Sequence, residues 1–152
     1  MDHLPDGAKL IADFISAERE TELLSQIDNA SWMVDLRRRV QHYGWRYDYR
    51  ARRVVTQTKI GPLPDWLLGE SRTLCDRHFF DREPDQIIIN EYEPGQGISP
   101  HIDCVPCFGP VVASLTLGGR TQMQFDNLVS GECVNAFLGP RSLLVLTGPA
   151  RF

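Results

Sequence analysis

The stretch from Ile87 to Asp103 constrains this chain more than any other part of the sequence. It begins with three isoleucines that are typical of a buried strand, continues through a Pro94-Gly95 turn, and ends in a short segment that carries His101 and Asp103. On an extended chain, residues two apart point to the same face. The sequence therefore predicts that the His101 imidazole and the Asp103 carboxylate reach one metal ion from the end of a strand.

An imidazole and a carboxylate on one side of an ion supply two of the three ligands of the 2-His-1-carboxylate triad found in non-haem Fe(II) sites. The alternative for this His-x-Asp triplet is a strand-end histidine that hydrogen-bonds a nearby aspartate. Asn90 and Tyr92 lie two apart on the preceding strand, and so on one face of it. Their side chains are neutral hydrogen-bond donors, which suits them to the oxygens of a carboxylate.

The run from Asn90 to Asp103, Asn-Glu-Tyr-Glu-Pro-Gly-Gln-Gly-Ile-Ser-Pro-His-Ile-Asp, resembles the signature of the AlkB-type 2-oxoglutarate- and Fe(II)-dependent dioxygenases. The resemblance covers the chain from about Arg37 onward and is nearest to the branch that includes the tRNA wobble-uridine hydroxylases. It implies that Asn90 and Tyr92 bind 2-oxoglutarate, and that His101 and Asp103 are the catalytic ligands of Fe(II). It also implies oxidative demethylation or hydroxylation of modified bases in DNA or in RNA, including tRNA.

A second informative stretch, residues 37–53, mixes arginines with aromatic residues. Seven arginines and one acid, Asp48, give it a charge of +6 in a chain of net charge −4, so the remainder carries −10. Such asymmetry points to a local anionic partner. Rings stack on bases and arginines neutralise phosphates, so the stretch suits an unstacked nucleotide, and it resembles the family's substrate-covering lid. The predicted substrate residues are Arg37, Arg38, Tyr43, Trp45, Arg46 and Tyr47.

Four aromatic residues alternate along this stretch: Tyr43, Trp45, Tyr47 and Tyr49. A strand here would place all four rings on one face, with His42, Arg46 and Asp48 on the other. The alternative is a strand whose aromatic face is simply core and whose arginines lie in solvent.

The rest of the chain predicts a mainly β protein. Short strands separated by turn residues, at 111–117, 121–125, 133–138 and 142–147, indicate a sandwich or barrel. An opening strand is expected within 8–15, followed by a helix capped by Ser16, and a second helix is expected after the Gly-Pro-Leu-Pro breaker at 61–64. We predict one α+β domain, residues 1–152. The family resemblance implies the double-stranded β-helix, or jelly-roll, with N-terminal helices packed on one sheet.

The length and the ends of the sequence give further expectations. A chain of 152 residues is long enough to bury a core as one domain. It has no run of about 18 apolar residues, and its first residues are acidic and polar, so we expect a cytoplasmic protein with no membrane association. We also expect a monomer.

The sequence departs from the family at its end. Residues 143–152 match the run that leads, in the family, to a second iron-binding histidine and then to arginines that bind the far carboxylate of 2-oxoglutarate. These residues do not follow within the 152 given, and none of His3, His42 and His78 matches the missing ligand. We therefore expect this chain to bind iron and co-substrate weakly and to turn over little.

Three alternatives compete with the oxygenase hypothesis. Cys104 and Cys107 form a C-x-x-C pair that can be half of a structural zinc site, although a second half is lacking. The Arg/Tyr-rich stretch 37–53 can serve a non-catalytic nucleic-acid-binding module. A cupin-like dioxygenase of small molecules would use the metal pair without that stretch.

Overall fold

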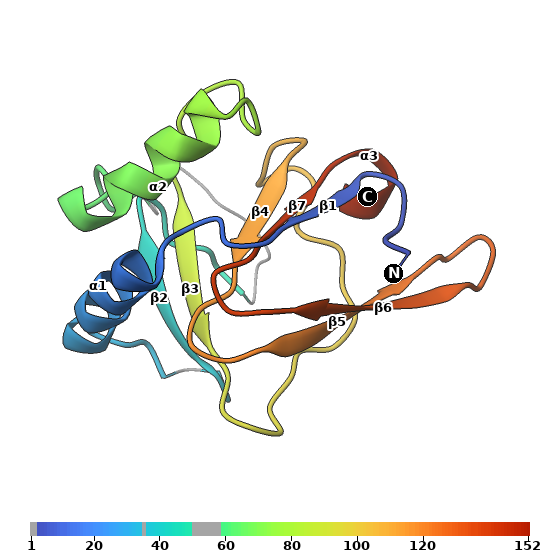
Figure 1. The fold of residues 1–152 in the computed structure, drawn as a ribbon, viewed down its shortest axis with the longest axis horizontal. Coiled ribbons are helices and arrows are strands. Elements are labelled where there is room, and N and C mark those ends of the chain that lie inside the picture. Colours follow the sequence, from blue (N-terminus) through green and yellow to red (C-terminus); the bar gives the residue numbers. More distant parts are fainter. Residues whose placement is uncertain (1–2, 35, 50–58) are drawn as a thin grey trace. The chain divides into compact units, whose positions relative to one another are not determined.

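The computed structural model describes residues 3–34, 36–49 and 59–152. Its elements, in chain order, are β1 (Ala8–Ile11), α1 (Ala17–Asn29), β2 (Arg39–Tyr43), α2 (Asp65–Asp76), β3 (Ile87–Glu91), β4 (Val112–Leu115), β5 (Thr121–Asp126), β6 (Cys133–Leu138), β7 (Leu143–Leu146) and α3 (Gly148–Arg151) (Figure 1). The mainly β character predicted from the sequence is confirmed. The chain divides into two compact units, one made of residues 1–27 and 100–152 and the other of residues 28–99.

The first unit contains an antiparallel sheet of β1, β7 and β4, with β7 in the middle (Figure 1). A strand that is buried on both faces has a continuously apolar sequence rather than an alternating one. Leu143, Leu144 and Val145 follow this rule, with exposures of 1%, 0% and 4%. This strand is the most deeply buried segment of the unit.

The strands β5 and β6 form an antiparallel hairpin in the same unit, in a register that runs from Thr121 opposite Leu138 to Asp126 opposite Cys133. Buried Ala136 and Leu138 pack with Leu144 in one core cluster, and the alternating apolar residues of β5 pack against it. The hairpin turn is closed by Asn127, whose side-chain oxygen accepts hydrogen bonds from two backbone N–H groups of the turn. The predicted turn at this position is confirmed.

The second unit contains the antiparallel pair β2–β3, in which Val40 lies opposite Asn90 and His42 opposite Ile88. One face of the pair packs on α2, where the Tyr43 ring lies edge-on to Trp66 at a centroid distance of 5.3 Å. The helix begins directly after Pro64, as the breaker predicts. Residues directly opposite each other share a face, so the other face carries Val40, His42, Ile88 and Asn90.

The strand β2 ends at Gly44, and this overturns one expectation. Gly44 has φ +80°, and a Cβ at this position would run into the backbone carbonyl of Asp85. The chain therefore turns here, and the alternation of aromatic residues does not continue on one strand. Tyr43 packs on α2, whereas Tyr49 lies edge-on to His42, on the opposite face of β2. The prediction that the four rings share one face is wrong.

The helix α1 begins where its cap predicts. The backbone N–H of Arg19 donates to the Ser16 hydroxyl at 3.1 Å, and Leu23 and Ile27 are buried. None of the helices in the described part of the chain has both the length and the apolar character needed to cross a bilayer. The strand pairings among the described residues form three separate sheets, so the closed jelly-roll remains a prediction.

Candidate metal and co-substrate site

The structure brings His101 and Asp103 together in the loop that precedes β4. Nε2 of His101 lies 3.5 Å from Oδ1 of Asp103, and both side chains are partly exposed, at 42% and 37%. The hydrogen bond from His101 holds the pKa of the Asp103 carboxyl below its ordinary value. Burial of the carboxyl opposes this shift, whereas the positive charges of His101 and Arg151 also lower the pKa. An ionised carboxylate beside an imidazole is therefore present at neutral pH.

The spacing of this pair fits two ligands of one ion. Ligand atoms about 2.1 Å from a metal lie about 3.0 Å apart at a right angle and about 4.2 Å apart across it. The observed 3.5 Å lies within that range. Imidazole nitrogen and carboxylate oxygen are donors that suit Fe(II). Over residues 3–34, 36–49 and 59–152, no three His, Cys, Asp or Glu side chains gather into a metal cluster.

The residues directly after Asp103 form a tight, cross-linked turn. A disulfide joins Cys104 and Cys107, and the backbone N–H groups of Cys107 and Phe108 both donate to the Cys104 carbonyl. Bridged cysteines offer no thiolate to zinc, so the structure does not support the structural-zinc alternative at this C-x-x-C pair.

Asn90 lies near the end of β3 in the second unit, on the strand face that is turned away from α2, and Tyr92 comes directly after the strand. Nε of Arg38 donates to Oδ1 of Asn90 at 2.9 Å. This bond uses the amide oxygen and leaves the amide NH₂ group as the donor. Tyr92 is 44% exposed. Arg38, a predicted substrate residue, thus contacts a predicted co-substrate residue instead.

His42 shares that face, and the sequence argument did not identify it. Its Nδ1 accepts a hydrogen bond from the Tyr47 backbone N–H at 3.4 Å, so the neutral ring carries its proton on Nε2. Nε2 is buried and has no hydrogen-bond partner among the residues that the structure describes. Burial lowers the pKa of His42, and the charge of Arg46 lowers it further. A buried donor without an acceptor is costly, which marks a position where a ligand oxygen can bind.

The face of β2–β3 therefore gathers donors that fit a dicarboxylic acid. The Asn90 amide, the Tyr92 hydroxyl and the His42 N–H are neutral, and Arg38 adds a fixed positive charge. His42 was predicted to lie opposite the aromatic face. The sequence feature that could have indicated the position of His42 is the His–Tyr–Gly run. Gly44 ends the strand, so the aromatic residues that follow can fold back over His42.

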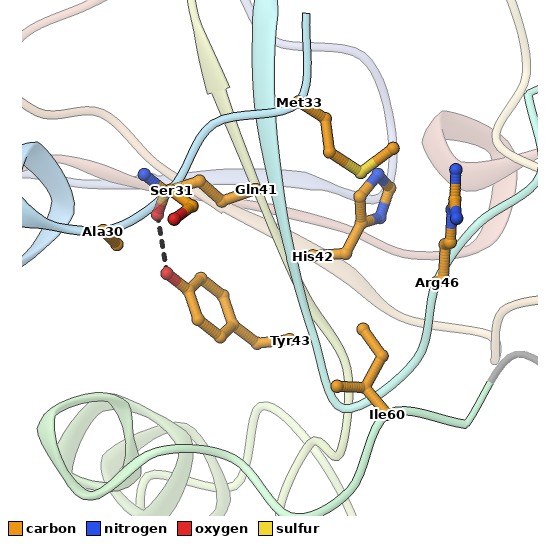
Figure 2. A pocket seen from close by; sticks show the side chains of 8 residues that line it. All are labelled: Ala30, Ser31, Met33, Gln41, His42, Tyr43, Arg46 and Ile60. Atoms are coloured by element: carbon orange, nitrogen blue, oxygen red, sulfur yellow. Dashed lines mark hydrogen bonds between the residues drawn. The ribbon is translucent and has the colours of Figure 1, made fainter. Parts of the chain in front are cut away.

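A pocket of about 310 Å³ lies along β2 within the second unit (Figure 2). Met33, His42 and Arg46 line one side of the strand, and Gln41 and Tyr43 line the other, where the Tyr43 hydroxyl donates to the Gln41 side-chain oxygen. Tyr43 and Arg46 are thus the predicted substrate residues that border a cavity.

The other predicted substrate residues are scattered. The Arg37 backbone carbonyl accepts a hydrogen bond from the Gln96 amide. The Lys59 ammonium lies 5.6 Å from the Trp45 ring, and the Tyr47 ring lies edge-on to Tyr49 at 5.0 Å. The remaining arginines of the basic stretch, at positions 50, 52 and 53, lie outside the described residues.

Comparison with known proteins identifies the family. A family model described as the 2OG-Fe(II) oxygenase superfamily matches residues 7–152. The chain is 37% identical over 154 residues to a Xenopus tropicalis protein named tRNA (carboxymethyluridine(34)-5-O)-methyltransferase alkbh8, covering 98% of this chain and 24% of that protein. It is 34% identical to the Arabidopsis thaliana "Alkylated DNA repair protein ALKBH8 homolog", covering 96% and 49% respectively.

A third relative is the Danio rerio "Probable RNA/DNA demethylase ALKBH6", at 32% identity over 80% of this chain and 50% of that protein. The chain thus spans about a quarter to a half of the length of these relatives. The match to the family model covers nearly every described residue, including both the His101–Asp103 pair and the β2–β3 face. The chain therefore belongs to the AlkB-like group of the 2OG-Fe(II) oxygenase superfamily.

Proposed function

We propose that this chain binds Fe(II) through His101 and Asp103 and 2-oxoglutarate through Asn90 and Tyr92, and that it oxidises modified bases in nucleic acid. The product is a hydroxylated base, or a base from which a methyl group has been removed. The observation that carries the proposal is the 3.5 Å approach of the His101 imidazole to the Asp103 carboxylate, in a member of an iron oxygenase superfamily. The closed jelly-roll, the monomeric state and the cytoplasmic location belong to the same proposal.

Each residue has a role that follows from its environment. Fe(II) together with 2-oxoglutarate and oxygen supplies the oxidant for a C–H bond, as the family description implies. Asp103 stays ionised because its pKa is lowered, so it presents oxygen lone pairs at neutral pH. Asn90 and Tyr92 donate hydrogen bonds to carboxylate oxygens, and Arg38 holds the Asn90 amide in one orientation.

Nucleic acid is the substrate class that the relatives and the sequence favour together. The relatives' names refer to tRNA, to alkylated DNA and to RNA or DNA demethylation. Arginines and aromatic rings in the described part of the basic stretch supply phosphate and base contacts of the kind used for unstacked nucleotides. Tyr43 and Arg46 border the pocket along β2, which places such groups beside a cavity.

Metal binding is the first test. Mn(II), a surrogate for Fe(II), is titrated into the full chain and the free ion is measured by electron paramagnetic resonance. We expect saturable binding that is lost in His101→Ala and in Asp103→Ala. His3→Ala is the matched control, because His3 is an exposed histidine outside the proposed ligand pair, and it should bind as the unchanged chain does. Equal binding by all four proteins would contradict the proposed ligands.

Turnover is the second test. The chain is incubated with Fe(II), 2-oxoglutarate and oligonucleotides that carry methylated or modified bases in DNA and in tRNA, and succinate and base products are followed by mass spectrometry. We expect slow succinate release, because the 152 residues supply two of the three iron ligands, and we expect it to be coupled to loss or hydroxylation of the modification. Nucleic-acid binding that persists in His101→Ala, with no product from any variant, would favour the non-catalytic binding module instead.

A further inference from the structure

Arg151 lies in the short helix α3. Among the buried side chains that the structure describes, it is the one that carries a charge. Its exposure is 3%, which is unusual for arginine because a buried cation needs partners for its N–H groups. Arginine keeps its charge at any ordinary pH, so the fold must accommodate a permanent cation here. The metal and co-substrate roles proposed above do not use it.

The partners of Arg151 are four backbone carbonyls in one loop. Nε donates to Gly109 at 3.1 Å and Nη1 donates to Asp103 at 2.9 Å. Nη2 donates to Cys104 and to Phe108, each at 3.4 Å. Residues 103–109 therefore curl around a single guanidinium, and their carbonyl dipoles balance its charge.

This loop begins at Asp103, one of the two proposed metal ligands. The Asp103 carboxylate lies beside His101. The shortest of the four bonds from Arg151 goes to the Asp103 backbone, which fixes the point from which the carboxylate projects.

The backbone that carries Arg151 is fixed to the core of the unit. Arg151 follows β7 by a few residues, and β7 is the most buried strand of the unit. The backbone between them is tied down, because the Thr147 N–H donates to the Gly7 carbonyl and the Ala150 N–H donates to the Asp6 carbonyl. The 103–109 loop is thereby attached to the core sheet through one planar side chain.

We propose that Arg151 is a positioning residue that holds the 103–109 loop and thereby keeps Asp103 placed beside His101 to bind the metal. The metal part of this inference rests on the proposed function, whereas the loop part does not. A planar fork with several N–H groups reaches four carbonyls at once, and a lysine ammonium cannot do so. The Arg151→Lys variant should therefore keep the positive charge and lose most of the hydrogen bonds to the loop.

Hydrogen exchange tests the loop directly in the full-length chain. Arg151→Gln and Arg151→Lys are compared with Arg120→Gln, which changes an exposed arginine elsewhere in the same unit. We expect the Cys107 and Phe108 amides to exchange about tenfold faster in both Arg151 variants, because their bonds to the Cys104 carbonyl depend on a loop that is held in place. The β6 segment 133–138 should be unchanged and serves as the internal reference.

Manganese affinity provides the second readout. We expect the Mn(II) dissociation constant to rise by about 10- to 100-fold in Arg151→Gln, by less in Arg151→Lys, and not at all in Arg120→Gln. His101→Ala should lose metal binding while its Cys107 and Phe108 amides exchange as in the unchanged chain. If the unchanged chain does not bind Mn(II), the proposed function fails and the exchange data still decide whether Arg151 holds the loop.

The inference is overturned if the Cys107 and Phe108 amides exchange at the unchanged rate in folded Arg151 variants, or if every segment becomes faster by the same factor. Should neither variant fold, nuclear magnetic resonance of the unchanged chain decides. A slowly exchanging Arg151 Nε proton, with contacts to Gly109, supports the role. A rapidly exchanging Nε proton contradicts it.

Discussion

Nε of Arg38 lies 2.9 Å from Oδ1 of Asn90, across one face of the β2–β3 pair. The next residue, Arg39, forms two hydrogen bonds of 2.7 and 2.8 Å to the Glu91 carboxylate on the opposite face. Neighbouring arginines in the basic stretch thus have different partners. One orients a predicted co-substrate residue, and the other forms a surface ion pair.

This difference predicts separate effects for the two arginines. Arg38→Ala should weaken 2-oxoglutarate binding about tenfold, equivalent to about 1.4 kcal/mol, because the Asn90 amide loses the bond that orients it. Arg39→Ala is the control, since its ion pair with Glu91 is solvent-screened and lies on the other face. Calorimetric titration with 2-oxoglutarate in the presence of Mn(II) measures both. Equal affinities for the two variants would show that Arg38 does not act through Asn90.

The low pKa of His42 predicts a pH-dependent stability. The unfolded chain takes up a proton near the ordinary histidine pKa of 6.5, whereas the folded ring resists protonation because it is buried beside Arg46. Folding stability is therefore full above about pH 6.5 and falls as the pH drops below that value. Urea unfolding at a series of pH values between about 5 and 8 measures the effect.

His42→Asn is the matched variant for this experiment, because the Asn oxygen can still accept from the Tyr47 N–H while the titrating group is gone. Its stability should change less than that of the unchanged chain across the same pH range. Arg46→Gln should raise the pKa of His42, as read from the ring proton shifts in nuclear magnetic resonance. A His42 pKa at or above 6.5 in the unchanged chain is the result that contradicts this reading of its environment.

Gly44 predicts the cost of adding one methyl group at the end of β2. Gly44→Ala places a Cβ against the Asp85 backbone and also forces a non-glycine residue to adopt φ +80°. Gly95→Ala is the control, because Gly95 has φ +87° and nothing within 4 Å of the added Cβ. The control should lose about 1–2 kcal/mol of unfolding free energy, from backbone strain alone, and Gly44→Ala should lose clearly more. Equal losses in thermal or urea unfolding would remove the steric argument.

The core cluster of the first unit predicts a large effect at Leu144, which is 0% exposed. Leu144→Ala should destabilise the chain by about 2–5 kcal/mol, through lost burial and the cavity that remains. Leu128→Ala, at a position that is 84% exposed, should change stability by less than about 0.5 kcal/mol. Urea unfolding of the two variants at the same pH gives the comparison.

The elements of the fold were largely predictable from the sequence. β6 has the predicted bounds, and the other predicted strands after Asp103 differ from the observed ones by one or two residues at their ends. Ser16 caps α1, because a hydroxyl before an acidic first turn is a local signal that needs no tertiary context. The alternation beyond Tyr43 misled the prediction, because the close approach of Gly44 to Asp85 is a contact between residues far apart in the sequence.

The proposed ligands of the candidate site were named from the sequence, whereas the residues that support them were not. The His-x-Asp and Asn-x-Tyr spacings are local patterns, and the side chains of the first lie together as the spacing predicts. The role of Arg151 depends on carbonyls more than 40 residues away, which no pattern in the sequence reveals. The buried Nε2 of His42 likewise depends on how Tyr47 and Tyr49 fold back after the strand ends.

The pairing of β1 with β7 has a consequence for biosynthesis. The Thr147 hydroxyl donates to the carbonyl of Gly7, 140 residues earlier, and Ala8 lies opposite Leu146. During translation, β1 therefore has no native neighbour in this sheet until β4 and β7 have been made. Contacts of such long range are slow to form, so this sheet should form late, and the nascent β1 segment should be a natural client of chaperones until then.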